Sequence, residues 1–194
     1  ESKYCVGCES EKTDSELVDG FCSDHPGKDL VIISEENYFF KYSAFTEKLL
    51  KFYEENPNFV VPDFRYNEIK AFVERGLQDF SISKKKKKMP WGIPVPNDEN
   101  HVMYVWFDAL TNYISTLGWP EDTENFEKFW KDGNPTQYCG KDNLRFQSAM
   151  WQAMLMAADL PNSHQIIING FITADGGVKM SKTLGNVVDP KDIV

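Results

Sequence analysis

"TQYCGKDNLRFQSAMWQAMLMAADLPNSHQIII", residues 136–168, contains the pattern that decides the fold of this chain. Residues 136–139 form a short β-type run, 142–159 form a long apolar helical pattern, and 164–168 form a second run rich in isoleucine. Strand, helix and strand in this order are typical of a parallel β-α-β unit with a right-handed crossover. The apolar stretch 101–107 is predicted to be a further strand, followed by a helix that Asp108 caps. The sequence therefore predicts an α/β fold with a parallel sheet.

Polar or glycine-containing junctions follow each of the three predicted strands. They are "WFDA" (106–109), "GKD" (140–142) and "NGF" (169–171). Ligands of an open parallel sheet bind outside the carboxyl ends of its strands, so we expect these junctions to lie along one rim. "GKD" is not a P-loop, because the glycine spacing differs from the Walker pattern and Asp142 follows the lysine. A glycine and then an aspartate at a helix start suit ribose hydroxyls, and the same aspartate can cap the helix.

The loop "GGVKMSKTLGN", residues 176–186, follows the last junction. Gly176 and Gly177 predict a tight turn. Lys179 and Lys182 stand three positions apart, so both side chains can reach one polyphosphate. The alternative is an exposed hairpin that binds no ligand.

Cysteine and histidine pairs near the start of the chain predict a metal site. Cys5 and Cys8 form one pair with two intervening residues, Cys22 and His25 form another, and thirteen residues separate the pairs. Such pairs are typical of structural zinc knuckles, in which four ligands complete a tetrahedron and no position stays open. The alternatives are a disulfide or a chance spacing.

Composition excludes several classes of function. The 194 residues are 41% hydrophobic and carry a net charge of −9, so nucleic acid cannot bind through the whole surface. No run of eighteen apolar residues occurs, and no membrane span is predicted. The lysine run 84–88 is interpreted as a solvated loop rather than a nucleic-acid contact. The chain begins without methionine or a signal-peptide pattern and ends at what looks like a helix start, so we interpret it as an internal piece of a longer protein.

Several stretches of the chain resemble a known family. "KMSKT" (179–183), with "GKD" upstream, is similar to the Lys-Met-Ser-Lys-Ser motif of class I aminoacyl-tRNA synthetases, and Thr183 keeps the hydroxyl of the last serine. "ENYFFKYSAF" (36–45), "YVWFDALTNYI" (104–114) and the Cys-Cys-Cys-His knuckle resemble the methionyl-tRNA synthetases of the single-zinc bacterial kind. The resemblance covers essentially the whole chain.

This resemblance implies an activity, substrates and a location. The longer protein would be a methionine-tRNA ligase of protein synthesis that makes methionyl-adenylate from methionine and ATP, with Mg²⁺ as counter-ion, and transfers methionine to tRNA(Met) in the cytoplasm. It would have no membrane partner. The alternatives are another class I synthetase, such as the cysteine or leucine enzyme, or a non-catalytic zinc-bearing module for tRNA binding or assembly.

The resemblance also implies roles for particular residues. The catalytic residues would be Lys179 and Lys182, which would hold the β- and γ-phosphates. The remaining implied ATP contacts are Gly140, Asp142 and the backbone near Ile172. The implied methionine contacts are Trp106, Ala109, Tyr113, Phe146, Gln147 and Trp151, with the Tyr113 hydroxyl as the polar contact to sulfur. The implied structural zinc ligands are Cys5, Cys8, Cys22 and His25.

The family's organisation implies domain boundaries. Residues 1–35 would be the zinc-knuckle part of a connective insertion, 36–98 its remainder, and 99–194 the second half of a Rossmann-like catalytic domain that ends in the lysine loop. The chain departs from the family at Gln147, where histidine is frequent, and at Leu110 and Gln152, where proline is frequent. None of its three histidines forms the His-x-Gly-His motif of the first catalytic half, so we expect the 194-residue chain alone to be inactive.

Overall fold

The structure, a computed structural model, describes residues 2–7, 10–12, 17–23, 25–33, 36–180 and 185–192. It divides into two compact units, one of Glu1–Phe39 with Ser81–Tyr104 and one of Phe40–Phe80 with Val105–Val194. Residues 40–80, which the sequence analysis groups with the insertion, therefore share a unit with residues 105–194. No helix in the described part of the chain is long and apolar enough to span a membrane.

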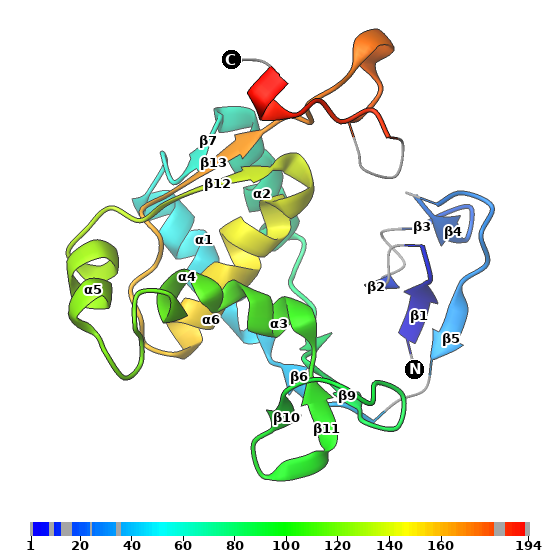
Figure 1. Ribbon diagram of the computed structural model, residues 1–194, viewed down its shortest axis with the longest axis horizontal. Helices are drawn as coiled ribbons and strands as arrows, with labels where there is room; N and C mark the ends of the chain where they lie inside the picture. Colours follow the sequence, from blue (N-terminus) through cyan, green and yellow to red (C-terminus); the bar gives the residue numbers. More distant parts are fainter. Residues whose placement is uncertain are drawn as a thin grey trace. The chain divides into compact units, whose positions relative to one another are not determined.

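A parallel three-stranded sheet organises the second unit. Its order is β12 (Thr136–Gly140), β13 (Gln165–Asn169) and β7 (Val60–Val61), and the three strands lie side by side in Figure 1. β12 and β13 pair in parallel from Thr136 opposite Gln165 to Gly140 opposite Asn169. The predicted β-α-β unit is confirmed.

One hydrophobic core packs helices against this sheet. The helices are a 3-10 turn η2 (Tyr42–Phe45), α1 (Thr46–Glu55), α2 (Asp63–Glu74) and a helical stretch of η4 (Lys141–Asn143), η5 (Phe146–Met150) and α6 (Trp151–Ala157). Ile166 and Ile168 of β13 enter this core, while Gln165 and Asn169 stay more exposed, as expected from the alternation of a strand. The left-handed backbone of Gly76, with φ 92°, follows the end of α2, where glycine is the usual residue.

A second core cluster of the same unit lies around Trp151. It contains residues from α3 (Val105–Leu110), α4 (Asn112–Ser115), α5 (Glu124–Phe126) and the π-helical turn η3 (Glu127–Lys131). Trp130 and Trp151 meet edge to face with ring centroids 6.0 Å apart. The chain then continues past β13 into the turn η6 (Asp175–Gly177) and, after the undescribed residues 181–184, into η8 (Pro190–Asp192).

The first unit contains small antiparallel sheets. One has the order β2 (Ser10–Lys12), β1 (Ser2–Cys5) and β5 (Val31–Ile33), and β3 (Leu17–Val18) pairs with β4 (Phe21–Cys22). Another has the order β10 (Pro94–Val95), β11 (Asp98–Met103) and β9 (Ser83–Lys85). The strands β6 (Phe39–Phe40) and β8 (Phe80–Ser81) pair with each other.

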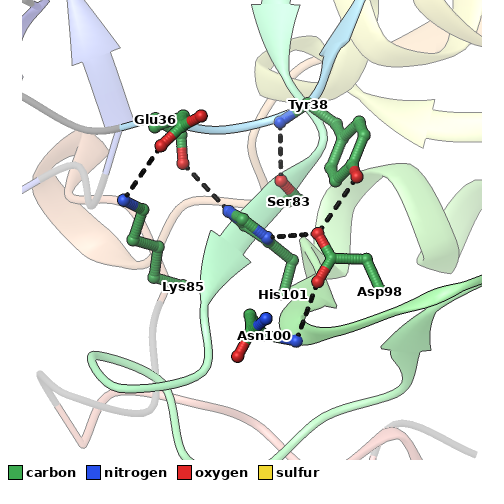
Figure 2. Close-up of polar contacts among 7 residues, drawn as sticks. All are labelled: Glu36, Tyr38, Ser83, Lys85, Asp98, Asn100 and His101. Carbon is green, nitrogen blue, oxygen red and sulfur yellow. Dashed lines mark hydrogen bonds and ion pairs between the residues drawn. The ribbon is translucent and has the colours of Figure 1, made fainter.

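A buried histidine ties together the segments around β11. His101 is 9% exposed, and its ring nitrogens lie 2.7 Å from the Asp98 carboxylate and 3.0 Å from the Glu36 carbonyl oxygen (Figure 2). The Tyr38 hydroxyl donates to the same carboxylate at 3.0 Å. The hydrogen bond to Glu36 and the Asp98 carboxylate raise the pKa of His101, because both acceptors favour the doubly protonated ring.

The prediction of a parallel strand at 101–107 is wrong. Residues Asp98–Met103 form an antiparallel strand in the first unit, and Val105–Leu110 form a helix in the second. Asp108 lies inside that helix and does not cap it. A short apolar run has no periodicity that separates a strand from a buried helix, so the sequence could not place this change.

Candidate functional site

A glycine hairpin brings Lys179 back to the start of the helical stretch. Gly176 and Gly177 have left-handed backbones, with φ of 76° and 74°, and the Met180 N–H donates to the Ile172 carbonyl oxygen at 2.9 Å. The predicted tight turn is confirmed. Ile172, the residue placed near adenine by the resemblance, is 74% exposed. Lys182 lies outside the described residues.

The half-exposed Lys179 ammonium group lies beside a carboxylate and over an aromatic ring. Its Nζ is 3.5 Å from the Asp142 carboxylate and 3.8 Å from the centroid of the Phe171 ring. Asp142 and Phe171 follow β12 and β13, whose ends Gly140 and Asn169 lie opposite each other. The structure thus brings two of the predicted junctions and the hairpin lysine to one rim, as a parallel sheet requires.

Gly140 lies directly beside the Asp142 carboxylate. A Cβ built there lies 2.7 Å from an Asp142 carboxylate oxygen. A larger residue would therefore contact this carboxylate, whose half-exposed side chain would have to move slightly.

Beside Gly140 opens a cavity of about 370 Å³. Its lining comes from α3, α4, β12 and the helical stretch, and consists of Trp106, Ala109, Leu110, Asn112, Tyr113, Tyr138, Cys139, Gly140, Asn143 and Gln147. The third predicted junction, 106–109, therefore reaches this rim from a helix and not from a strand end. No lining residue has a charged side chain at neutral pH, so the cavity suits an uncharged group that needs apolar contact and a few hydrogen bonds.

The two other aromatic residues predicted for this site do not line the cavity. Phe146 stacks on Trp106 with ring centroids 4.7 Å apart and planes 19° apart. Trp151 is 1% exposed, lies 6.0 Å from the Tyr113 ring, and lines a separate apolar cavity of about 230 Å³. Phe146 thus contacts the lining residue Trp106, and Trp151 contacts Tyr113 as a member of the second core cluster.

Cys139 adds no nucleophile to the cavity. Burial, with a smaller contribution from the Asp142 charge, raises the pKa of its thiol to about 11. The thiol stays protonated at neutral pH, and a thiol is a far weaker nucleophile than a thiolate. The arrangement suits binding and positioning of reactants rather than covalent catalysis.

Sequence reasoning named Gln147 but missed the polar side chains to which it connects, Gln137, Ser163 and Gln152. Gln147 donates to the Tyr113 hydroxyl oxygen at 2.9 Å and accepts from Gln137 at 2.6 Å. Gln137 and Gln147 are each 6% exposed, and Gln152 is fully buried. The signal was Gln147 and Gln152 within the mostly apolar stretch 146–157, because a buried carboxamide must find hydrogen-bond partners.

A candidate metal centre lies in the first unit. The ligand atoms of Cys5, Cys22 and His25 all lie within 4.8 Å of one another, and the two cysteines form no disulfide. A Cβ at Gly7 would lie 2.6 Å from the His25 ring, so only glycine allows the ring to approach the knuckle. Cys8, the fourth predicted ligand, lies outside the described residues.

The sequence profile of the family described as tRNA synthetases class I (M) matches residues 1–194. The chain therefore belongs to the class I tRNA synthetases, in the group designated M. Its curated relatives in that group bear the name methionine–tRNA ligase.

Two relatives and one solved structure illustrate the extent of the match. The methionine–tRNA ligase of Caldanaerobacter subterraneus subsp. tengcongensis is 47% identical over all of this chain, which spans 30% of that relative's length. The ligase of Nostoc sp. is 45% identical over 98% of this chain and 36% of its own length. The crystal structure of Mycobacterium tuberculosis methionyl-tRNA synthetase bound by methionyl-adenylate superposes with a TM-score of 0.83 at 41% identity, and covers 99% of this chain and 37% of that one. The chain thus spans about a third of the length of these relatives, and the Rossmann-like α/β fold is confirmed.

Proposed function

We propose that the protein containing this chain is a methionine–tRNA ligase. The observation that carries the proposal is the uncharged cavity at the end of β12, next to a hairpin lysine and a carboxylate on the same rim. The match to a synthetase solved with methionyl-adenylate supports it. A reaction between an apolar amino acid and a nucleotide needs these two adjoining environments.

The cavity would hold the methionine side chain. Trp106, Ala109 and Gln147 line it, while Phe146 packs against Trp106 and Trp151 against the Tyr113 ring. The Tyr113 hydroxyl would contact the sulfur. An apolar pocket alone discriminates one methylene group by about 10- to 200-fold, so a polar contact adds selectivity for sulfur.

The rim would hold ATP. Gly140 and Asp142 would accept the ribose, the backbone near Ile172 would meet adenine, and Lys179 would bind the phosphates with Mg²⁺. In the present arrangement Lys179 pairs with Asp142 at 3.5 Å, so ATP would replace this ion pair by contacts of its own. Lys182 would join Lys179 at the phosphates, although its position lies outside the described residues.

The chemistry requires no covalent residue. A carboxylate oxygen of methionine attacks the α-phosphorus of ATP, the bond from that phosphorus to the bridging oxygen breaks, and pyrophosphate leaves. A terminal ribose hydroxyl of tRNA(Met) then attacks the methionyl carbonyl carbon, and AMP leaves. The protein orients the reactants and stabilises the charge that develops on pyrophosphate.

We also propose a structural zinc ion on Cys5, Cys8, Cys22 and His25. The three described ligands fit it, because two buried thiols and an imidazole within 4.8 Å are a soft donor set of the right size. Such an ion would stabilise the knuckle by the role that a hydrophobic core has in a larger domain. Because four protein ligands would fill its coordination sphere, it would take no part in the reaction.

Methionine-dependent ATP–pyrophosphate exchange by the full-length protein tests this function. Exchange with methionine, and far less with cysteine or leucine, is the expected result. Exchange driven by either of those instead would favour another class I synthetase. Binding of tRNA without any exchange would favour the non-catalytic module. The 194-residue chain alone is expected to show no exchange, because it lacks the His-x-Gly-His motif.

A further inference from the structure

A continuous line of buried side chains runs from the cavity into the protein. Gln147 Nε2 lies 2.9 Å from the Tyr113 hydroxyl oxygen, and Gln137 Nε2 lies 2.6 Å from Gln147 Oε1. Ser163 Oγ lies 2.6 Å from Gln137 Oε1, and Gln152 Nε2 lies 3.1 Å from Ser163 Oγ. Apart from Tyr113, each is at most 6% exposed. We call Gln147, Gln137, Ser163 and Gln152 the amide relay.

Two backbone groups fix the direction of the amide relay at its inner end. The Ser163 backbone N–H lies 3.0 Å from Gln152 Oε1, and Gln152 Nε2 lies 2.8 Å from the Gln147 backbone carbonyl oxygen. A backbone N–H can only donate and a carbonyl oxygen can only accept. The Gln152 carboxamide therefore has one orientation, with its oxygen toward Ser163 N and its nitrogen toward the helix carbonyl. The Asn162 side chain also donates to Gln152 Oε1, at 3.1 Å.

The orientation of Gln152 also determines which groups donate and which accept in the hydrogen bonds from Ser163 outward to Tyr113. The Ser163 hydroxyl accepts from Gln152 and donates its single proton to Gln137 Oε1, 2.6 Å away. That turns Gln137 Nε2 toward Gln147 Oε1, and Gln147 Nε2 toward Tyr113. The Tyr113 oxygen consequently accepts a hydrogen bond. Its own proton has no acceptor within the described part of the chain, and Tyr113 lines the cavity.

We propose that the amide relay is a specificity device that keeps the Tyr113 hydroxyl as a donor toward the cavity. Gln137, Ser163 and Gln152 are then positioning residues that act on the ligand through Gln147 and Tyr113. The relay favours a substrate side chain with an acceptor atom, such as thioether sulfur, over an aliphatic chain of the same length. This inference rests on the proposed function, because it concerns the pocket that would take methionine.

Removal of one member of the amide relay is expected to reverse the donor and acceptor in the hydrogen bond between Gln147 and Tyr113. Without the Ser163 hydroxyl, Gln137 Oε1 has lost its donor, and the Gln137 and Gln147 carboxamides are free to turn over together. Gln147 Oε1 then faces Tyr113, and the tyrosine donates its proton inward instead of into the cavity. A neutral hydrogen bond contributes enough that its loss reduces the preference for sulfur by about two- to tenfold.

The test compares methionine with norleucine, which has a methylene group where methionine has sulfur. In the full-length protein, kcat/KM for ATP–pyrophosphate exchange is measured with each amino acid. Ser163→Ala should lower the ratio of methionine to norleucine about two- to tenfold while norleucine itself changes little. A purely structural defect lowers both values alike, and an unchanged ratio would overturn the proposal.

A double-mutant cycle separates the relay from general damage. Tyr113→Phe removes the donor and should lower the ratio by itself. Adding Ser163→Ala to Tyr113→Phe should then lower the ratio no further, because the relay acts only through the tyrosine proton. Independent, additive losses would show that Ser163 acts by another route. Ser163→Thr, which keeps the hydroxyl, should keep the wild-type ratio of methionine to norleucine.

A second variant keeps the test decisive if Ser163→Ala does not fold. Gln137→Leu cuts the line at another point and should give the same fall in the ratio. Gln165→Leu is the matched control, because Gln165 begins the adjacent strand β13 and its side chain donates to the Asn58 carbonyl oxygen at 2.9 Å, outside the relay. An inactive wild-type protein would refute the proposed function. An active one whose ratio neither Ser163→Ala nor Gln137→Leu changes would refute the relay alone.

Discussion

Replacement of Lys179 by alanine tests whether this lysine only stabilises the fold or also acts on the reaction. In the described structure its ammonium group pairs with Asp142 at 3.5 Å, both side chains being 51% exposed, and lies over Phe171. A half-exposed ion pair contributes about 0.2–1 kcal/mol and an exposed cation–π contact about 0.5–1 kcal/mol. If these contacts were its whole role, Lys179→Ala would cost at most about 2 kcal/mol of folding stability and little activity.

A phosphate role predicts a larger and different effect. Loss of one donor that acts on developing charge costs about 3–4 kcal/mol of transition-state stabilisation, or roughly a hundred- to a thousandfold in rate. Lys179→Ala in the full-length protein should therefore slow methionyl-adenylate formation by that factor. Methionine affinity should stay nearly unchanged, because Lys179 does not line the cavity. Lys182→Ala should follow the same pattern.

Pre-steady-state adenylation kinetics with a methionine titration provide the measurement. Lys128→Ala is the matched control, since that lysine also lies over a phenylalanine ring, at 5.0 Å, but does not contact the rim residues Asp142 and Phe171. A variant with an unchanged adenylation rate and a raised methionine dissociation constant would refute the role assigned to the hairpin.

Three further predictions concern the metal, the histidine network and the core. Cys22→Ser should abolish tight zinc binding in metal analysis of the purified protein and Cys139→Ser should not; full zinc content in the first variant would exclude the site. Because the pKa of His101 is raised above its ordinary 6.5, its stabilising contribution is complete below pH 6.5 and is lost as the pH rises through the folded-state pKa. His101→Gln should remove this loss of stability. Urea unfolding curves from about pH 6, near the unfolded-state pKa, to about pH 9 test this, and a variant whose unfolding free energy has the wild-type pH dependence would contradict the assignment. The pKa of Asp98 is lowered, so its contribution is present above pH 3.8 and is lost as the pH falls through the folded-state value. Tyr53→Phe should lower the free energy of unfolding by about 1–2 kcal/mol, because a fully buried hydroxyl at 2.7 Å from a helix carbonyl oxygen is removed; a loss below the error of the measurement would contradict it.

The sequence by itself determined the parts of the fold that depend on local patterns. Residues 136–140 and 165–169 had β-type composition on either side of a long apolar helix, and the rule for parallel connections gave their pairing. Glycine chemistry placed the turn at Gly176 and Gly177, since their positive φ angles suit glycine. The spacing of Cys5, Cys22 and His25 likewise brought these residues together as predicted.

Tertiary structure decided the features that depend on contacts between distant segments. The two-residue strand β7 forms by pairing with β13, and no pattern in "FVV" (59–61) predicts that pairing. The apolar run at 101–107 is divided between a strand and a helix according to the neighbours each half packs against. The amide relay joins positions 113 and 163 through hydrogen bonds whose direction two backbone groups impose. A sequence specifies the side chains of such a network, but their orientation follows from the geometry that folding creates.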